Sequence, residues 1–175
     1  MINKEIEQKI RTIPNFPKIG INFKDITPLL LDSKLSEKIV DIFIEKLKDY
    51  KVDAVVGIES RGFLYGFLLA NRLKVPFIPI RKVGKLPADT LKYKYNLEYG
   101  SSEMEIHKYD IKKDWNVVIH DDLLATGGTA VAASELITKL NANVSAFTFV
   151  IELGSLSGSK YLKKYSNNII SLMNY

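Results

Sequence analysis

The 175-residue chain has no cysteine, and its only histidines are His107 and His120. The absence of cysteine excludes disulfides, thiolate zinc sites, iron–sulfur clusters and a cysteine nucleophile. Two histidines are too few for a histidine-rich metal cage, and Ser-His-Asp chemistry could use only one of them. The longest uncharged apolar stretch, residues 62–71, is far shorter than the roughly 18 residues that span a bilayer. We therefore expect a soluble, cytoplasmic protein that does not enter a membrane.

Basic residues outnumber acidic residues by 25 to 20, so the net charge is +5. This balance favours anionic partners, and both nucleic acids and phosphorylated small molecules satisfy it. The aromatic residues form no stripe interleaved with basic ones, so we expect no nucleic-acid partner. With 46% hydrophobic and 26% charged residues, the composition is that of a globular protein, and the length suits a single domain over residues 1–175.

Alternating apolar segments predict an α/β fold with a central parallel sheet flanked by helices. We expect strands at 52–58, 75–80, 116–121 and 144–151. Helical spacing predicts helices at 2–13, 62–73 and 129–140, and a further helix that Asp32 or Ser33 caps, with its apolar stripe from Leu35 to Leu47. We expect a loop at 23–28. Residues 91–99 and 104–109 are typical of two antiparallel strands around 100–102, so a flexible hairpin flap is predicted within an insertion at 84–112.

The strongest functional pattern is the run Val117–Thr129, Val-Val-Ile-His-Asp-Asp-Leu-Leu-Ala-Thr-Gly-Gly-Thr. A buried strand carries Asp121 and Asp122 to its carboxyl end, where open α/β sheets bind ligands. A turn of small residues then enters a helix, and its backbone N–H groups favour an anion. We expect a phosphate on this turn, whose residues are Ala125, Thr126, Gly127, Gly128 and Thr129.

The acid pair beside this turn would repel an anion unless it has another task. It could bind ribose hydroxyls, offset a developing cation, or hold Mg²⁺ directly or through water. The alternative is a capped helix after a buried strand, with Asp122 as an exposed cap. His120 is expected to pack on the face of the strand opposite Asp121, and His107 to face solvent, so we assign neither to catalysis.

Two further patches follow strands. The turn Glu59-Ser60-Arg61-Gly62 offers N–H groups and one guanidinium to an anion, although Ser60 could instead be a helix cap. It is not a P-loop, because Phe63 stands where that motif requires lysine. The second patch is the basic cluster Arg81, Lys82 and Lys85, which could stabilise a diphosphate leaving group or form a solvated turn.

The run Asp121–Thr129 resembles the phosphoribosyl-diphosphate (PRPP) binding motif of the type I phosphoribosyltransferase family, and most closely that of its adenine phosphoribosyltransferases. Segments similar to that family occur in order at 23–28, 57–63, 81–87, 97–100 and 152–156, so the resemblance extends from about residue 6 to about residue 172. It implies transfer of the 5-phosphoribosyl group from PRPP to adenine, which gives AMP and pyrophosphate. It also implies Mg²⁺, a homodimer, and a small N-terminal hood with the base-site loop at 1–33.

The resemblance also implies roles for individual residues. Backbone atoms of Asn22 would read the adenine edge, and Phe23 and Leu123 would pack on its two faces. Lys24 is counted with the substrate-binding residues, although it stands where many relatives carry arginine and lysine is not equivalent to arginine in a bidentate or stacked contact. Glu98 would be the general acid–base for a purine nitrogen, with Tyr99 in a closing lid. Read without the resemblance, Phe23 could be ordinary core and Glu98 an exposed strand residue.

The same resemblance assigns the remaining contacts. The turn with Glu59, Ser60 and Arg61 would hold pyrophosphate, with a cis peptide bond before Ser60. Arg81, Lys82 and Lys85 would contact the diphosphate, in some relatives from a neighbouring subunit. Mg²⁺ would bind mainly through PRPP and water, with Asp121 and Asp122 as the acidic candidates nearby.

Two other functions fit the same pattern. One is a phosphoribosyltransferase for a different purine, such as hypoxanthine or guanine. The other is a non-catalytic PRPP sensor that regulates transcription by binding DNA. The residues before Phe23 are too few for a winged helix, and the presence of Glu98 and Arg61 favours the enzyme.

Overall fold

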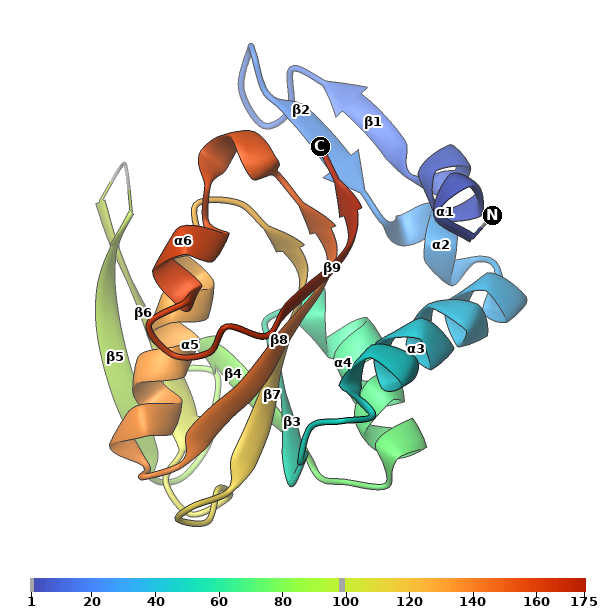
Figure 1. The fold of residues 1–175 in the computed structure, drawn as a ribbon. Helices are drawn as coiled ribbons and strands as arrows, with labels where there is room; N and C mark the ends of the chain where they lie inside the picture. The colour runs from blue at the N-terminus through green and yellow to red at the C-terminus, as the bar shows by residue number, and fades with distance from the viewer. Residues whose placement is uncertain (1, 98–99) are drawn as a thin grey trace. The chain divides into compact units, whose positions relative to one another are not determined.

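The computed structural model describes residues 2–97 and 100–175 of the chain. It divides into two units, residues 1–42 and 43–175, and the boundary falls within helix α3 (Ser33–Leu47). We describe each unit separately (Figure 1).

The first unit contains α1 (Ile2–Lys9), β1 (Arg11–Pro14), β2 (Asn22–Asp25), α2 (Thr27–Leu30) and the start of α3. The expected helix at 2–13 is wrong beyond Lys9, because Arg11–Pro14 pairs antiparallel with β2. The expected loop at 23–28 likewise begins as a strand. Arg11 lies opposite Asp25, and its Nη2 atom is 2.8 Å from Asp25 Oδ2, so a pairing between distant segments overrides the local helical spacing.

Helix α3 begins as predicted. Asp32 Oδ1 accepts a hydrogen bond from the Leu35 backbone N–H at 3.1 Å, which satisfies one of the free donors in the first turn. The hydrogen bond to Leu35 lowers the pKa of Asp32.

The second unit is built on a seven-stranded sheet with the order β5-β6-β4-β3-β7-β8-β9. In chain order, its strands are β3 (Ala54–Ile58), β4 (Phe77–Lys82), β5 (Thr90–Leu97), β6 (Gly100–His107), β7 (Asn116–Leu124), β8 (Asn143–Glu152) and β9 (Ile169–Asn174). Strands β4, β3, β7, β8 and β9 are parallel, whereas β6 pairs antiparallel with both β4 and β5. The predicted α/β fold with a central parallel sheet is confirmed.

Two details of this sheet differ from the sequence expectations. Leu97 pairs with Gly100, so residues 100–102 begin β6 and do not form the turn. Strand β9 was not predicted. The antiparallel pair β5–β6 joins the central sheet, since Lys82 of β4 pairs with Met104 of β6.

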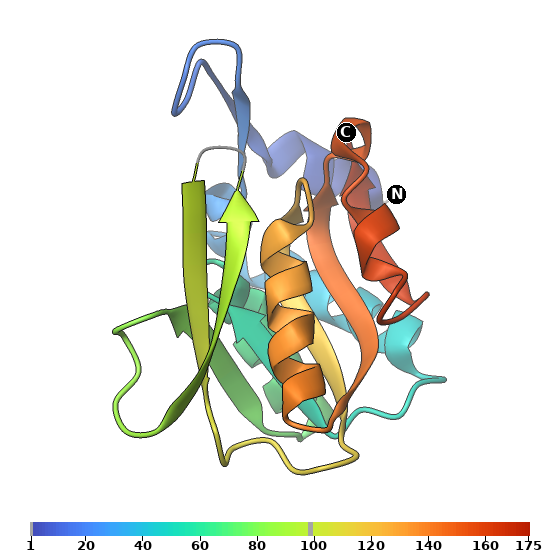
Figure 2. The ribbon, with the colours of Figure 1, turned by 90° about the vertical axis from the view of Figure 1, so that its left-hand side faces the viewer.

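The helices of the second unit are α4 (Gly62–Leu73), α5 (Gly128–Lys139) and α6 (Ser159–Leu162), and the single 3₁₀ turn among the described residues is Gly154–Leu156. Helices α4 and α5 cover opposite faces of the sheet (Figures 1 and 2). Helix α4 connects β3 to β4 on one side, and α5 connects β7 to β8 on the other, so the winding direction reverses between β3 and β7. Such a reversal opens a crevice at the carboxyl ends of the two strands.

Helix α4 approaches β7 closely at Gly62. A Cβ atom there would lie 2.8 Å from the carbonyl oxygen of His120, so glycine is required for this contact. Along the described parts of the chain, every helix is too short or too polar to cross a membrane.

Candidate active site

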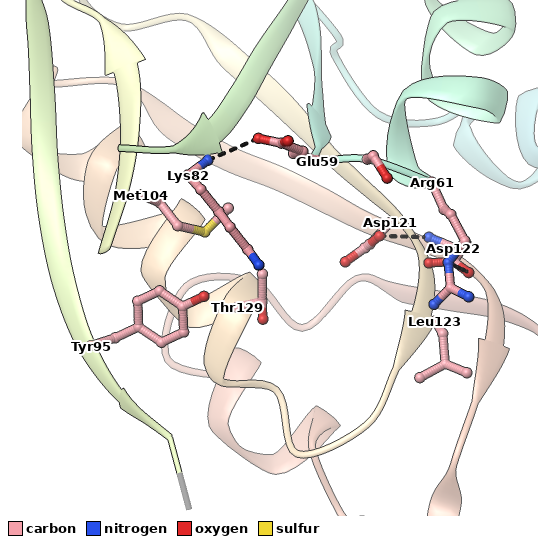
Figure 3. Close-up of a pocket in the computed structure, with 10 residues that line it drawn as sticks. Glu59, Arg61, Lys82, Tyr95, Met104, Asp121, Asp122, Leu123 and Thr129 are labelled. Carbon is pink, nitrogen blue, oxygen red and sulfur yellow. Dashed lines mark hydrogen bonds and ion pairs between the residues drawn. The ribbon is translucent and has the colours of Figure 1, made fainter. Parts of the chain in front are cut away.

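Two adjoining cavities lie at the carboxyl ends of β3 and β7. The first has a volume of about 180 Å³ and is lined by Glu59, Ser60, Arg61, Lys82, Tyr95, Met104, Asp121, Asp122, Leu123 and Thr129 (Figure 3). The second, of about 190 Å³, is lined by residues 121 and 123–130 and by Phe149. Asp121, Leu123 and Thr129 line both cavities, so the acid pair lies between a basic region and the turn 125–129.

The turn 125–129 has the geometry of an anion site. Strand β7 ends at Leu124 and α5 begins at Gly128, so only three residues connect them. Gly127 has φ of +85°, a left-handed conformation that side chains disfavour, and it turns the backbone into the helix. No side chain caps α5, so N–H groups of its first turn remain available at the positive end of a 12-residue helix.

Gly158 supports this turn from behind. A Cβ atom on Gly127 would lie 2.7 Å from the Gly158 carbonyl oxygen, and one on Gly158 would overlap the Ala125 carbonyl oxygen. The two backbones therefore touch without side chains between them. Sequence reasoning missed Gly158, because nothing in the local pattern Ser157-Gly158-Ser159 indicates which distant segment it contacts.

The acid pair occupies the centre of the site. Asp122 is only 3% exposed, and its Oδ2 atom lies 2.8 Å from Arg61 Nε. Its backbone N–H donates to Asp121 Oδ1 at 2.9 Å. The alternative of an exposed helix cap is therefore wrong. In Figure 3, Arg61, Asp122 and Leu123 lie on one side of the cavity, and Lys82, Met104 and Tyr95 lie on the other.

Burial and mutual repulsion control the protonation of this pair. Burial and the charge of Asp122 raise the pKa of Asp121 well above its usual value, and the Arg61 charge only partly opposes this. Burial also raises the pKa of Asp122, again against the nearby Arg61. A positive charge between the two cavities would stabilise both ionised carboxylates.

His120 lies beneath the acid pair and takes no part in the cavity lining. It is fully buried, its Nδ1 atom is 2.9 Å from Thr148 Oγ1, and its ring contacts Phe43 edge-on. Burial lowers the pKa of His120 to about 3, so the imidazole is neutral and packed, as predicted.

His107 was expected to face solvent. Its side chain is 25% exposed, and its ring nitrogens contact Asp110 and the Pro87 carbonyl.

The basic cluster gathers on one carboxylate, that of Glu59. Glu59 Oε1 accepts a hydrogen bond from Lys85 Nζ at 2.7 Å, and Oε2 accepts one from the Lys82 backbone N–H at 3.0 Å. Arg81 Nε is 3.3 Å from Oε2. Burial raises the pKa of Glu59, but the hydrogen bonds from Lys85, Lys82 and Arg81 outweigh it and lower the pKa to about 2. The charged groups of Arg81 and Lys85 are thus ordered, unlike those of a solvated turn, and Lys82 is held through its backbone.

The turn after β3 has the backbone that the resemblance implied, since the Glu59–Ser60 peptide bond is cis. The N-cap of α4 is Arg61 and no side chain caps this helix, so the alternative of Ser60 as a helix cap is wrong. Ser60 instead lines the first cavity beside Arg61 and Lys82.

The remaining predicted residues belong to the first unit or fall outside the described part of the chain. Asn22, Phe23 and Lys24 belong to β2 of the first unit, where Phe23 packs edge-on against Phe16 and Lys24 Nζ donates to Thr12 Oγ1 at 3.0 Å. Their roles in binding a base stay predictions. Glu98 and Tyr99 lie outside the described residues, and their roles stay predictions as well. Sequence reasoning also missed Tyr95 and Met104, which line the first cavity.

Comparison with known proteins identifies relatives over nearly the whole chain. The family described as "Phosphoribosyl transferase domain" matches residues 29–171. The chain is 50% identical to a Clostridium botulinum protein named adenine phosphoribosyltransferase, over 97% of this chain and 98% of the relative.

Solved structures agree with this result. The adenine phosphoribosyltransferase of Thermoanaerobacter pseudethanolicus superimposes with a TM-score of 0.95 at 48% identity and covers 99% of both chains. The Saccharomyces cerevisiae enzyme, solved with an imino-altritol bisphosphate and adenine, superimposes with a TM-score of 0.91 at 42% identity and covers 98% of both chains.

The contact between Gly158 and the turn 125–129 predicts the effect of one added methyl group. Gly158→Ala should lower the free energy of unfolding by about 1–3 kcal/mol, because the new Cβ atom meets backbone and the turn must shift. Its φ of −60° suits alanine, so conformational strain does not contribute. Urea denaturation measures the effect, with the exposed Lys160→Ala as a control that should change little. Equal stability of Gly158→Ala and the wild type would contradict the contact.

The pKa of Glu59 predicts a specific acid sensitivity. Its folded pKa of about 2 lies below its ordinary value of 4.5, so between these pH values the unfolded chain binds the proton and the folded chain does not. Its stabilisation is complete above pH 4.5 and is lost as the pH falls toward 2. Glu59→Gln should therefore lose stability less steeply over this window than the wild type in urea titrations at successive pH values. The exposed Glu103→Gln should keep the wild-type slope; identical slopes for Glu59→Gln and the wild type would exclude the ion cluster.

Proposed function

Since the chain belongs to the phosphoribosyltransferase family and has adenine phosphoribosyltransferases as full-length relatives, we propose that it transfers the 5-phosphoribosyl group from PRPP to adenine, giving AMP and pyrophosphate. The observation that carries this proposal is the order of charges along the two cavities. A backbone anion site, an acid pair and a basic cluster follow one another. PRPP has the same order of complementary groups, with a phosphate, a ribose and a diphosphate.

The 5-phosphate is assigned to the turn 125–129. The free N–H groups at the start of α5 and the hydroxyls of Thr126 and Thr129 are donors for its oxygens. No cationic side chain is required there, because backbone dipoles and the helix terminus supply the positive potential.

The ribose is assigned to the acid pair. Carboxylates accept hydrogen bonds from ribose hydroxyls, and their negative charge offsets a transition state with oxocarbenium character. Asp121 faces both cavities and is therefore the carboxylate in direct reach of the sugar, whereas Asp122 is buried against Arg61. The pKa values of both carboxyl groups are raised, so their ionisation becomes more favourable as positive charge develops on the sugar. The pair therefore stabilises the transition state more than the bound substrate.

The diphosphate is assigned to the first cavity. Ser60, Arg61 and Lys82 line this cavity, and Arg81 and Lys85 are held beside it through Glu59. Cations already in position stabilise the charge that develops on a leaving pyrophosphate. Glu59 is thus a residue that holds the cationic groups of Arg81 and Lys85 in place, because its oxygens already accept hydrogen bonds from them.

Mg²⁺ fits this site as a partner of the substrate. No three His, Cys, Asp or Glu side chains gather as a metal site within residues 2–97 and 100–175. The two carboxylates at the cavity suit an ion that takes most of its ligands from phosphate oxygens and water, as Mg²⁺ does. We propose that such an ion neutralises diphosphate charge when bound, with Asp121 and Asp122 as its protein neighbours.

Adenine is assigned to the region of Leu123, whose side chain lines both cavities. Phe23 would cover the opposite face of the ring, and backbone atoms of Asn22 would match the amino group and adjacent ring nitrogen of adenine. Oxopurines reverse this donor and acceptor pattern and would leave buried groups unpaired. Tyr99 is proposed to close over the bound base.

Further parts of the proposal concern the assembly and its location. Helix α4 exposes Leu64, Phe67 and Leu68, which share one face at i, i+3 and i+4 spacing. An apolar helix face of this kind supports a homodimer, since a second copy would remove it from water.

We propose one catalytic domain with a hood at 1–33 and a flap at 84–112, acting in the cytoplasm.

Base selectivity tests the proposed reaction. With PRPP and Mg²⁺, radiolabelled adenine should be converted to AMP, and kcat/KM for hypoxanthine or guanine should be lower by about 10⁴-fold, because those bases leave hydrogen-bonding groups unpaired. Comparable rates with an oxopurine would assign the chain to a different purine. Binding of PRPP without turnover of any base would instead identify a sensor.

The acid–base role proposed for Glu98 makes a separate prediction. Glu98→Gln should lower kcat by about 100-fold or more, the usual contribution of a general acid–base, while the Kd of AMP changes little. Steady-state kinetics and calorimetry with AMP measure the two quantities. The exposed Glu103→Gln in β6 serves as the control and should match the wild type. Equal losses in turnover and AMP affinity would remove the acid–base role.

A further inference from the structure

Glu105 is a buried carboxylate outside the set of residues assigned above. It lies in β6, opposite Arg81 of β4, and is only 2% exposed. Ionised side chains are rarely buried unless their oxygens are hydrogen-bonded, so the partners of this carboxylate show what it does.

The carboxylate of Glu105 accepts hydrogen bonds from the segment 83–90, which connects β4 to β5. Its Oε1 atom accepts hydrogen bonds from the backbone N–H groups of Lys85 and Leu86, each at 2.9 Å, and Oε2 accepts one from Thr90 Oγ1 at 3.0 Å. Burial raises the pKa of Glu105, but these hydrogen bonds outweigh it and lower the pKa, so the carboxylate is ionised.

Lys85 is consequently fixed at three points. Glu105 holds its backbone N–H, Arg81 Nη1 donates to its carbonyl oxygen at 3.1 Å, and Glu59 Oε1 accepts from its ammonium group at 2.7 Å. The backbone and the side chain of one lysine are thus held by two carboxylates, one in strand β6 and one in the turn after β3. Without Glu105, the backbone donors of Lys85 and Leu86 would lose their acceptor, and Lys85 would be held only by Arg81 and Glu59.

We propose that Glu105 is a positioning residue for the diphosphate end of PRPP, which acts through Lys85 and Arg81 and touches no substrate atom. Cations that are fixed before binding lose less conformational entropy when the diphosphate arrives. The inference rests on the proposed function for its ligand. It goes beyond that function because it states that Glu105, in strand β6, determines how the basic cluster is arranged through the hydrogen bonds it accepts.

The test compares Glu105→Ala with Glu105→Gln. Glu105→Ala should weaken binding of inorganic pyrophosphate and raise KM for PRPP about ten-fold, while KM for adenine stays within about two-fold, since a hydrogen bond to a charged group is worth at least about 1.4 kcal/mol. Glu105→Gln should recover most of the loss. Its amide oxygen can accept from Lys85 and Leu86, and its amide nitrogen can donate to Thr90 Oγ1.

A matched control separates positioning from general destabilisation. Ile106 is the fully buried neighbour of Glu105 in β6, and Ile106→Val should lower the melting temperature without changing pyrophosphate affinity. If Glu105→Ala does not fold, Thr90→Val removes the partner of Oε2 alone and should weaken pyrophosphate binding in the same direction, by less. Calorimetry with pyrophosphate reads binding independently of turnover.

The outcomes are distinct. A wild type that uses no PRPP would contradict the proposed function, whatever the variants do. An active wild type with unchanged pyrophosphate affinity in Glu105→Ala, equal increases in KM for both substrates, or a Glu105→Gln variant as impaired as Glu105→Ala would overturn the positioning role.

Discussion

The parallel pairing of β3 with β7 is the constraint on which the site depends. Val56 lies beside Ile119 and Gly57 beside His120, so the two strands deliver their carboxyl ends to the same place. The connections then leave toward opposite faces, through α4 and α5. A crevice between them is the geometric consequence. The acid pair lies at the end of β7, Glu59 and Arg61 follow β3, and the basic cluster lies at the end of β4 and just after it. At Gly62, the start of α4 lies directly against the backbone of β7.

Within the crevice, charge is arranged in three zones that use different physical means. The turn 125–129 attracts anions with backbone dipoles, whose orientation the fold fixes. The central acid pair is held at raised pKa values by burial, so its ionisation responds to positive charge nearby. The basic cluster is ordered by carboxylates, because Glu59 and Glu105 both stay ionised through the hydrogen bonds they accept. Few of these charges are left to be oriented by solvent, which lowers the reorganisation that ligand binding requires.

A part of the structure could be predicted from the sequence where the residues that determine it are consecutive or nearly so. The run Val117–Thr129 could be interpreted correctly because the strand, the acid pair and the helix start are consecutive, and the structure confirms the strand, turn and helix in that order. Arg11–Pro14 was misassigned because its conformation depends on pairing with β2, which no local periodicity reports. Glu105 and Gly158 were missed for the same reason: each contacts backbone atoms that are remote in the sequence, 20 and 19 residues away at Lys85 and Leu86 for Glu105, and in the turn 125–129 for Gly158. The alternating pattern of β6 predicted a strand but could not indicate that one of its carboxylates is buried.

The two ends of the site differ in a way that suits the proposed reaction. The 5-phosphate belongs to both PRPP and AMP, so it needs no release during the transfer, and donors that the backbone holds in place are appropriate for it. The diphosphate must bind as part of one molecule and leave as another. Lys85 and Arg81 share a carboxylate of the protein, so Glu59 offers their charges a partner once the anion departs. An internal anion that takes back these cations lowers the free energy of the emptied site and thereby opposes excessively tight retention of pyrophosphate. The fixed backbone donors of the turn 125–129 and the cations that can return to Glu59 together suit a pocket that keeps the sugar phosphate. The same pocket exchanges the group at the anomeric carbon of the sugar.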